Sequence, residues 1–106
     1  MTSFQIHPGA QKEFDEAFHY YLEIDPELAD EFDSAFFRYL DTILASPLLF
    51  NIRRGSVRRA NLKPRFGEYY IAYMIWNQQV VILAIAHAKR RPYYWSGRIS
   101  EAKKMF

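Results

Sequence analysis

Apolar side chains recur at helical spacing in two successive stretches that are joined by a short connection. The first stretch carries Ala10, Phe14, Ala17, Phe18, Tyr21 and Leu22. The second carries Leu28, Phe32, Ala35, Phe36, Tyr39, Leu40 and Ile43. Steps of three and four residues place each set on one face of a helix. Two helices joined by so short a connection form an antiparallel hairpin, and the apolar face of such a hairpin needs a second layer to cover it.

The junction between the two helices has the sequence of a helix start. Asp25 is a favourable N-cap, Pro26 suits the first helical position, and Glu27 interacts well with the helix dipole. The first helix is therefore expected to end at residues 23–24. Ser46-Pro47 is expected to end the second helix.

The remaining segments predict a sheet. Four stretches have the β-branched, aromatic or alternating character of strands, and they are separated by turn residues such as the pair Asn77-Gln78. The expected strands are residues 4–6, 56–62, 69–76 and 79–87, with irregular segments at 48–55 and 63–67. The stretch 79–87 is the most apolar and does not alternate cleanly, so we expect it to be interior and covered on both faces.

These elements together predict an α+β fold within a single domain spanning residues 1–106. Its order is β-α-α-β-β-β, with the helical hairpin packed on a three- to four-stranded antiparallel sheet. A basic, aromatic C-terminal tail follows the last strand, and the sequence leaves open whether residues 96–106 form a helix.

Charge is distributed unevenly along the chain, although the net charge is only +2. Residues 1–50 contain two basic and ten acidic residues, a net of −8, whereas residues 51–106 contain twelve basic and two acidic residues, a net of +10. Clustered basic residues favour a surface that meets a polyanion or an acidic partner. The alternative is that the two halves neutralise each other in space. The charged residues of the first helix, Glu13 among them, are expected mostly to face water.

Composition excludes several classes of protein. The chain has no cysteine, which rules out disulfides and thiolate metal sites and fits a reducing compartment. His7 and His19 have no second ligand near them in the sequence, so neither a metal site nor a cofactor is expected. The N-terminus has no signal-peptide pattern, and the longest apolar run, 80–86, is too short to span a bilayer. We therefore expect a cytoplasmic protein.

Residues 80–98 carry the most specific pattern in the chain. An apolar strand ends in His87, and then come Arg90, Pro92, the pair Tyr94-Trp95 and Arg98. This arrangement resembles the C-terminal signature of the RelE/ParE superfamily, whose members are often described as plasmid stabilisation proteins. Upstream residues that fit the sheet of the same family are Arg58, Arg59, Arg65, Phe66 and Tyr73.

The resemblance implies the toxin of a bacterial type II toxin–antitoxin pair, and three functions stay open. A ParE-like protein would inhibit DNA gyrase by binding. A RelE-like protein would cut messenger RNA on the ribosome. A third possibility is an inactive homologue or a basic binding module. The first is favoured because RNA-cleaving members often have a phosphate-binding Arg where this chain has residues 67–70, Gly-Glu-Tyr-Tyr. All three share an expected antitoxin partner whose acidic C-terminal segment folds onto the basic face.

Candidate site residues follow from the same comparison. RNA cleavage through the 2′-hydroxyl needs a base, cations for the phosphate and an acid for the leaving oxygen. If the protein is RelE-like, His87, Arg58 and Tyr94 are the catalytic candidates, and Glu68 is the only nearby carboxylate that the sequence indicates. Candidates for binding the target or a nucleic acid are Arg59, Arg65, Arg90, Arg91 and Arg98. The structural alternatives are that His87 is satisfied by the backbone and that Trp95 belongs to the core.

Overall fold

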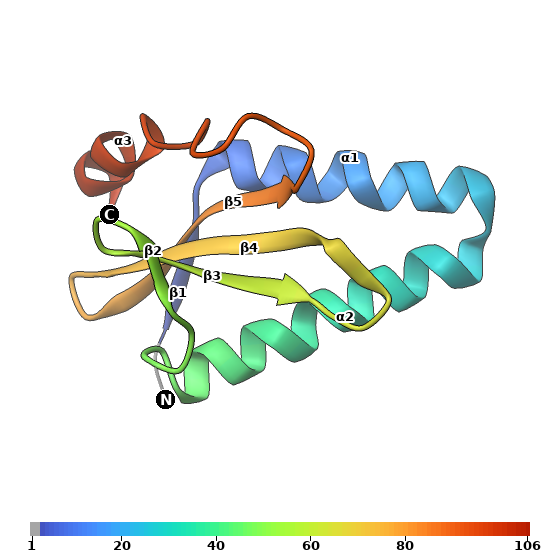
Figure 1. Ribbon diagram of the computed structural model, residues 1–106, viewed down its shortest axis with the longest axis horizontal. Helices are drawn as coiled ribbons and strands as arrows, with labels where there is room; N and C mark the ends of the chain where they lie inside the picture. The colour runs from blue at the N-terminus through green and yellow to red at the C-terminus, as the bar shows by residue number, and fades with distance from the viewer. Residues whose placement is uncertain (1–2) are drawn as a thin grey trace.

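The computed structural model describes residues 3–106, in which a helical hairpin packs on a mixed sheet (Figure 1). The α+β class and the expected order of elements are confirmed. A short helix follows the last strand, in the segment 96–106 that the sequence left open. In chain order the elements are β1 (Phe4–Ile6), α1 (Pro8–Ile24), α2 (Pro26–Ala45), β2 (Ile52–Arg54), β3 (Val57–Leu62), β4 (Phe66–Trp76), β5 (Gln79–His87) and α3 (Arg98–Met105).

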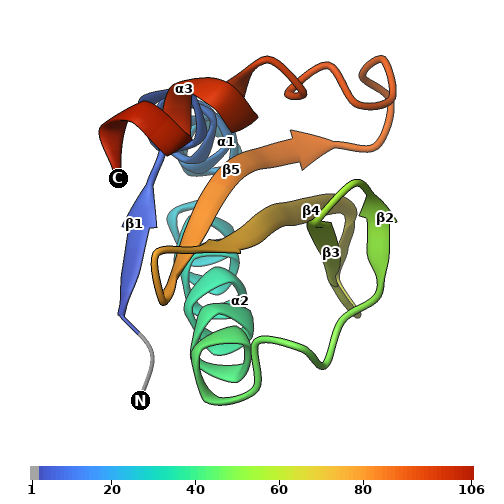
Figure 2. The same ribbon diagram turned by 90° about the vertical axis from the view of Figure 1, so that its left-hand side faces the viewer.

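The strand order across the sheet is β1-β5-β4-β3-β2, which Figure 2 shows from left to right. β1 pairs with β5 in parallel, and every other neighbouring pair is antiparallel. The sheet thus has five strands rather than three or four. The additional strand is β2, which lies in the segment 48–55 that was expected to be a loop. A run of only three residues gives too few positions for an alternating pattern to be visible in the sequence.

A tight turn and a bulge explain where the later strands begin and end. Asn77 and Gln78 both have positive φ, 51° and 63°, as a tight two-residue hairpin turn requires, so the predicted turn is confirmed. β4 begins three residues earlier than expected, because Leu62 pairs with Phe66 across a bulge and extends the β3–β4 ladder.

Asp25 both ends α1 and starts α2. Its backbone N–H donates to the Tyr21 carbonyl, and its side chain accepts the N–H of Glu27 at 3.0 Å. The expected junction is therefore confirmed. α1 begins at Pro8, where the side chain of His7 accepts the N–H of Gly9 at 2.9 Å and acts as the N-cap.

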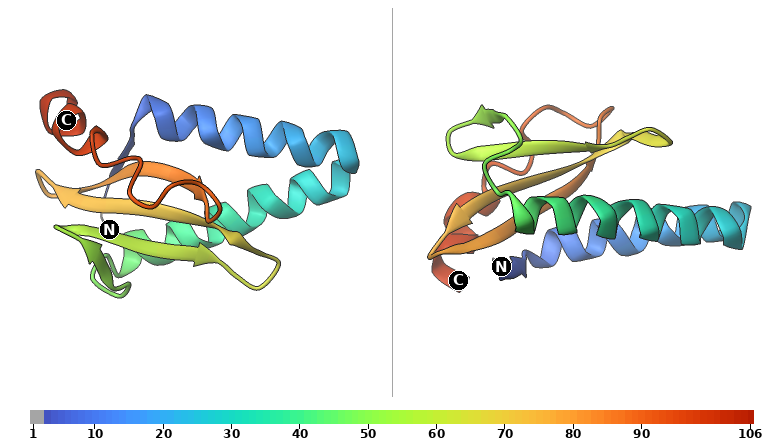
Figure 3. Two further views of the ribbon diagram at one scale, coloured as in Figure 1. Left: turned by 45° about the horizontal axis from the view of Figure 1, so that its top comes forward. Right: turned by 90° about the horizontal axis from the view of Figure 1, so that it is seen from below.

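The sheet is covered on both faces. One apolar core lies between the sheet and the hairpin, and a second lies between the opposite face and the C-terminal segment. The right-hand view of Figure 3 shows the two hairpin helices together on one side of the strands. β5 contributes to both cores, and its residues 80–86 are buried, as its apolar sequence predicts. Within residues 3–106, no helix is long and apolar enough to cross a membrane.

The C-terminal tail reverses direction after β5 and runs back over the sheet to α3 (Figure 1). Trp95 anchors it: its side chain is 2% exposed, and its indole N–H donates to the Tyr70 hydroxyl at 3.1 Å. Trp95 is therefore a core residue, as expected. The tail fixes the positions of Arg90, Tyr94 and Arg98, and through them the geometry of the candidate site.

Candidate functional site

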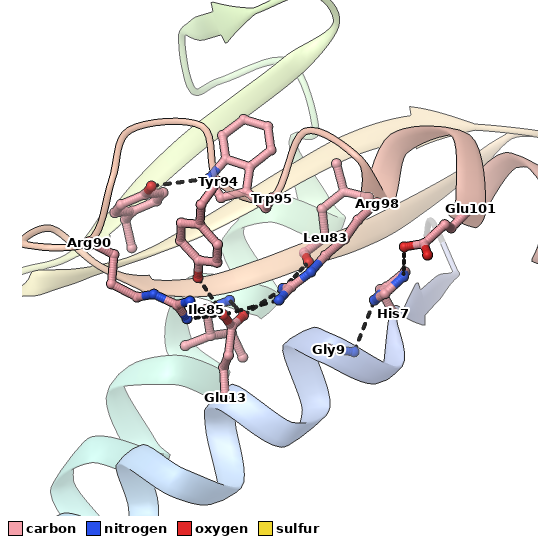
Figure 4. Close-up of polar contacts among 11 residues, drawn as sticks. His7, Gly9, Glu13, Leu83, Ile85, Arg90, Tyr94, Trp95, Arg98 and Glu101 are labelled. Carbon is pink, nitrogen blue, oxygen red and sulfur yellow. Dashed lines mark hydrogen bonds and ion pairs between the residues drawn. The ribbon is translucent and has the colours of Figure 1, made fainter.

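Glu13 of α1 is the centre of a polar cluster that joins α1 to the C-terminal tail (Figure 4). Its side chain is 11% exposed, and it accepts hydrogen bonds from Arg98 Nη1 at 2.8 Å and Arg90 Nη1 at 3.0 Å. The Ile85 N–H, at 3.2 Å, and the Tyr94 hydroxyl also donate to it. The expectation that Glu13 faces water is wrong. Glu13 is thus a carboxylate that the sequence did not indicate, beside three of the candidate residues, Arg90, Tyr94 and Arg98.

The burial of Glu13 has a signal in the sequence, because small residues surround it on the helix. Glu13 lies four residues after Gly9, three after Ala10 and four before Ala17, so it shares a helix face with three small residues. Small side chains let another segment approach the helix closely. Ala10 and Ala17 are buried, and an acid between them is placed where the tail arrives.

The Tyr94 hydroxyl is tied to this carboxylate. Burial raises the pKa of Tyr94 above its ordinary value, and the hydrogen bond to Glu13 and the negative charge of Glu13 raise it further. The nearby Arg90 and Arg98 lower it by less. Tyr94 therefore keeps its proton at neutral pH, directed at Glu13, and is a weak acid for a leaving group.

Arg98 links α3 to both α1 and the sheet. Besides Glu13, its guanidinium donates to the Leu83 carbonyl at 3.0 Å. It lies so close to α1 that a Cβ at Gly9 would be 2.6 Å from its Cζ atom. A second link joins the same elements, because His7 Nε2 lies 3.0 Å from a carboxylate oxygen of Glu101. The candidate binding residue Arg98 thus holds the tail in place.

His87 lies at the end of β5, and the binding candidate Arg90 and the carboxylate Glu13 line the same hollow. Its Nδ1 accepts the N–H of Lys89 at 3.1 Å, and its ring packs edge-on against Tyr69 with centroids 4.9 Å apart. This surface hollow has a volume of about 230 Å³. Within residues 3–106, no group of three His, Cys, Asp or Glu residues could hold a metal ion.

Arg58 binds backbone carbonyls of the loop that precedes β2. Its Nη1 donates to the Phe50 carbonyl at 2.7 Å and approaches the Leu48 carbonyl at 3.4 Å. The Tyr73 hydroxyl donates to the Pro47 carbonyl, at 2.7 Å, in the same loop. Together these bonds attach the loop between α2 and β2 to the sheet.

The sheet register separates Arg58 from His87. Arg58 pairs with Tyr73 on one side of β4, and His87 pairs with Tyr69 on the other side. Four residues along a strand correspond to ~13 Å, and two strand spacings correspond to ~10 Å. The structure therefore does not bring these two catalytic candidates together around one phosphate.

The remaining candidate cations lie on different surfaces. Arg65 forms an ion pair with Glu31 of α2 at 3.0 Å, beside a mixed-charge hollow of about 340 Å³. Arg90 stacks on the Tyr94 ring with its Cζ 3.8 Å from the centroid, and Arg91 is exposed in the tail. Arg59 stacks on Tyr70 at 3.9 Å, on the sheet face opposite Arg58, as strand alternation predicts.

A basic and aromatic surface lies around β2 and β3, and of its arginines the sequence predicted Arg59 as a binding residue but not Arg53 or Arg54. Arg53 and Arg59 line two adjacent hollows of about 250 Å³ each, and Tyr93 lines one of them. Arg54 lies over the Tyr93 ring at 4.6 Å. The signal was the two arginine pairs, 53–54 and 58–59, on either side of Gly55. It was missed because the segment 48–55 was expected to be a loop, so the first pair was not placed on a strand beside the second.

A search of curated proteins gives no match. The family model described as the ParE toxin of the type II toxin–antitoxin system parDE matches residues 4–92. The match thus covers the helical hairpin, all five strands, Glu13, His87 and Arg90, and it stops before Tyr94 and Arg98. Because it spans most of the 106 residues, the chain belongs to the ParE toxin family of type II toxin–antitoxin systems.

Proposed function

We propose that this toxin acts as a non-enzymatic inhibitor that binds DNA gyrase in the cytoplasm, in a plasmid stabilisation module. Membership of the family implies that the protein is a type II toxin with an antitoxin partner. The observation that supports inhibition without catalysis is that the three catalytic candidates do not form one site. Arg58 is engaged by loop carbonyls, Tyr94 by Glu13, and His87 lies roughly 16 Å from Arg58 by strand geometry.

Tyr70 adds support. It occupies the part of β4 where RNA-cleaving relatives have a phosphate-binding Arg. Its hydroxyl accepts the indole N–H of Trp95, and Arg59 stacks on its ring. Tyr70 is therefore a buried packing residue that anchors the tail, and it supplies no charge to a phosphate.

A RelE-like nuclease is the second candidate because His87 and Arg90 line one hollow. A base and a cation side by side are part of what cleavage through the 2′-hydroxyl requires. In that case the reaction would proceed at the His87 hollow without Arg58. An inactive homologue is the third candidate, and it would have kept the fold and the antitoxin interface only.

Expression from a tightly controlled promoter, without an antitoxin, tests the proposal. Growth, chromosome breakage and the rate of protein synthesis are followed from the moment of induction. A gyrase inhibitor should arrest growth with double-strand breaks, leave messenger RNA intact, and inhibit supercoiling by purified gyrase. His87→Ala should still arrest growth, because no proton transfer is required.

Two outcomes would contradict the proposal. An immediate stop in protein synthesis with cut messenger RNA, both lost in His87→Ala, would establish the nuclease. Normal growth at good expression, with the protein folded by circular dichroism, would establish an inactive homologue.

A further inference from the structure

The basic residues of the second half divide into two groups in space. Arg65, Arg90 and Arg98 form ion pairs with Glu31 or Glu13. Within residues 3–106, five other arginines of this half form no ion pair with a carboxylate: Arg53, Arg54, Arg58, Arg59 and Arg91. Four of these five arginines lie on β2 and β3, away from the Glu13 cluster, and Arg91 lies in the tail.

The two hollows of this surface form one track because Arg53 and Arg59 line both of them. Tyr93 lines one of the two hollows and Lys63 lines the other. Among the described residues that line the two hollows, none is an Asp or Glu. An anion in the track would meet cations and neutral side chains along its whole length.

Tyr93 presents an aromatic ring in this track. Its side chain is 38% exposed, although it is a large aromatic residue, and its φ is +61°. A non-glycine residue at positive φ is strained, and such a conformation persists only where surrounding contacts hold it. Here the Tyr93 carbonyl accepts bonds from the N–H and hydroxyl of Ser96, at 2.9 and 2.7 Å. The backbone thus keeps the ring beside Arg54.

We propose that this track binds single-stranded nucleic acid, with phosphates at Arg53, Arg54, Arg59 and Lys63 and one base stacked on Tyr93. A row of cations with an exposed ring is the arrangement that binds single strands without reading their sequence. The carboxylates of an acidic peptide would bind the same cations, but such a peptide has no base to stack on the Tyr93 ring. Binding here involves no catalysis and is independent of the gyrase proposal.

Fluorescence anisotropy of the purified full-length protein tests this inference. The probe is a labelled oligothymidylate of about twelve nucleotides, with an abasic oligonucleotide and polyglutamate of matched charge as competitors. We expect a dissociation constant between about 1 and 100 µM near physiological salt. The logarithm of the binding constant should fall with that of salt concentration with a slope of about −3, from four phosphates at about −0.7 each.

Variants separate the charge from the ring. Arg53→Ala/Arg54→Ala should weaken binding at least about tenfold and reduce the slope by about 1.4. Tyr93→Ala should weaken binding by about tenfold with little change in slope, and Tyr93→Phe should retain it. The control Lys12→Ala/Lys104→Ala removes the same charge from exposed positions on α1 and α3, outside both hollows, and should change binding less than about twofold.

Three results would overturn the inference. One is polyglutamate competing as well as the oligonucleotide, which would assign the track to an acidic polypeptide. Another is equal binding of the abasic strand together with no effect of Tyr93→Ala. The third is an equal loss in the Arg53/Arg54 variant and the lysine control, which would reduce the binding to net charge. Circular dichroism of each variant shows that a loss is not due to unfolding.

Discussion

The carboxylate of Glu13 and the guanidinium of Arg98 meet at 2.8 Å although 85 residues separate them in the chain. This pair joins the first helix to the last one and fixes the tail that covers the second face of the sheet. Both side chains are largely buried, at 11% and 20% exposure. An ion pair removed from water to this extent is strongly destabilising when one partner is lost, because the other charge stays buried without compensation.

Glu13→Gln should therefore lower the free energy of unfolding by about 3 kcal/mol. The amide keeps the shape of the side chain but leaves Arg90 and Arg98 without a counter-charge. Urea denaturation followed by circular dichroism measures the change. Glu16→Gln, one turn further along α1 and exposed, is the control and should stay within about 0.5 kcal/mol of the parent protein. Equal effects of the two substitutions would show that Glu13 is an ordinary surface acid.

Gly9→Ala should displace the Arg98 guanidinium. The added Cβ would lie 2.6 Å from Cζ, and Arg98 cannot swing away without losing Glu13 and the Leu83 carbonyl. We expect a loss of about 1–3 kcal/mol from this overpacking. Gly97→Ala is the matched control, since its Cβ meets nothing within 4 Å and its φ is −63°. The double variant Gly9→Ala/Glu13→Gln should lose less than the sum of the single losses, and additivity would mean that the two sites act separately.

Tyr70→Phe should destabilise the tail. It removes the acceptor of the buried Trp95 indole N–H and leaves that donor unsatisfied, at a cost of about 1–3 kcal/mol. The environment of Trp95 changes at the same time, so its fluorescence should report the effect. Tyr20→Phe, at an exposed position on α1, removes the same hydroxyl without such a partner and should be close to neutral. A tail that keeps its stability and fluorescence in Tyr70→Phe would show that this bond contributes little.

The elements of the fold were largely predictable because their signals are local. The helical stripes, the Asp25-Pro26 junction and the turn at Asn77-Gln78 each depend on residues within a few positions of one another. β2 was not predictable in this way, since three exposed residues become a strand only through pairing with β3.

The candidate site was less predictable because its contacts are distant in sequence. Nothing near Arg90 or Arg98 in the chain indicates that Glu13 neutralises them. The clustered arginines of residues 90–98 therefore suggested a binding surface at the tail. In the structure Arg90 and Arg98 are paired with Glu13, whereas four arginines on β2 and β3 form no ion pair with a carboxylate: Arg53, Arg54, Arg58 and Arg59. Tertiary packing decides which charges meet, because Glu13 lies on α1 whereas Arg90 and Arg98 lie in the tail and at the start of α3.

Alkaline pH should unfold the protein through its buried tyrosines. Burial raises the pKa of Tyr94 and Tyr21 above the ordinary value of 10, and Glu13 adds to the shift at Tyr94. Above pH 10 the unfolded chain loses these protons while the folded chain keeps them. Their contribution to stability is thus complete below pH 10 and decreases as the pH rises further.

Urea midpoints measured from about pH 8 to pH 11.5 should show this decline, by up to about 1.4 kcal/mol per pH unit for each such tyrosine. Tyr94→Phe should be less stable than the parent at pH 8, because Glu13 loses a donor, yet it should decline less steeply above pH 10. The two curves should therefore converge as the pH rises. Parallel curves over this range would mean that the Tyr94 hydroxyl ionises as readily in the folded protein as in the unfolded chain, and that its bond to Glu13 does not hold the proton.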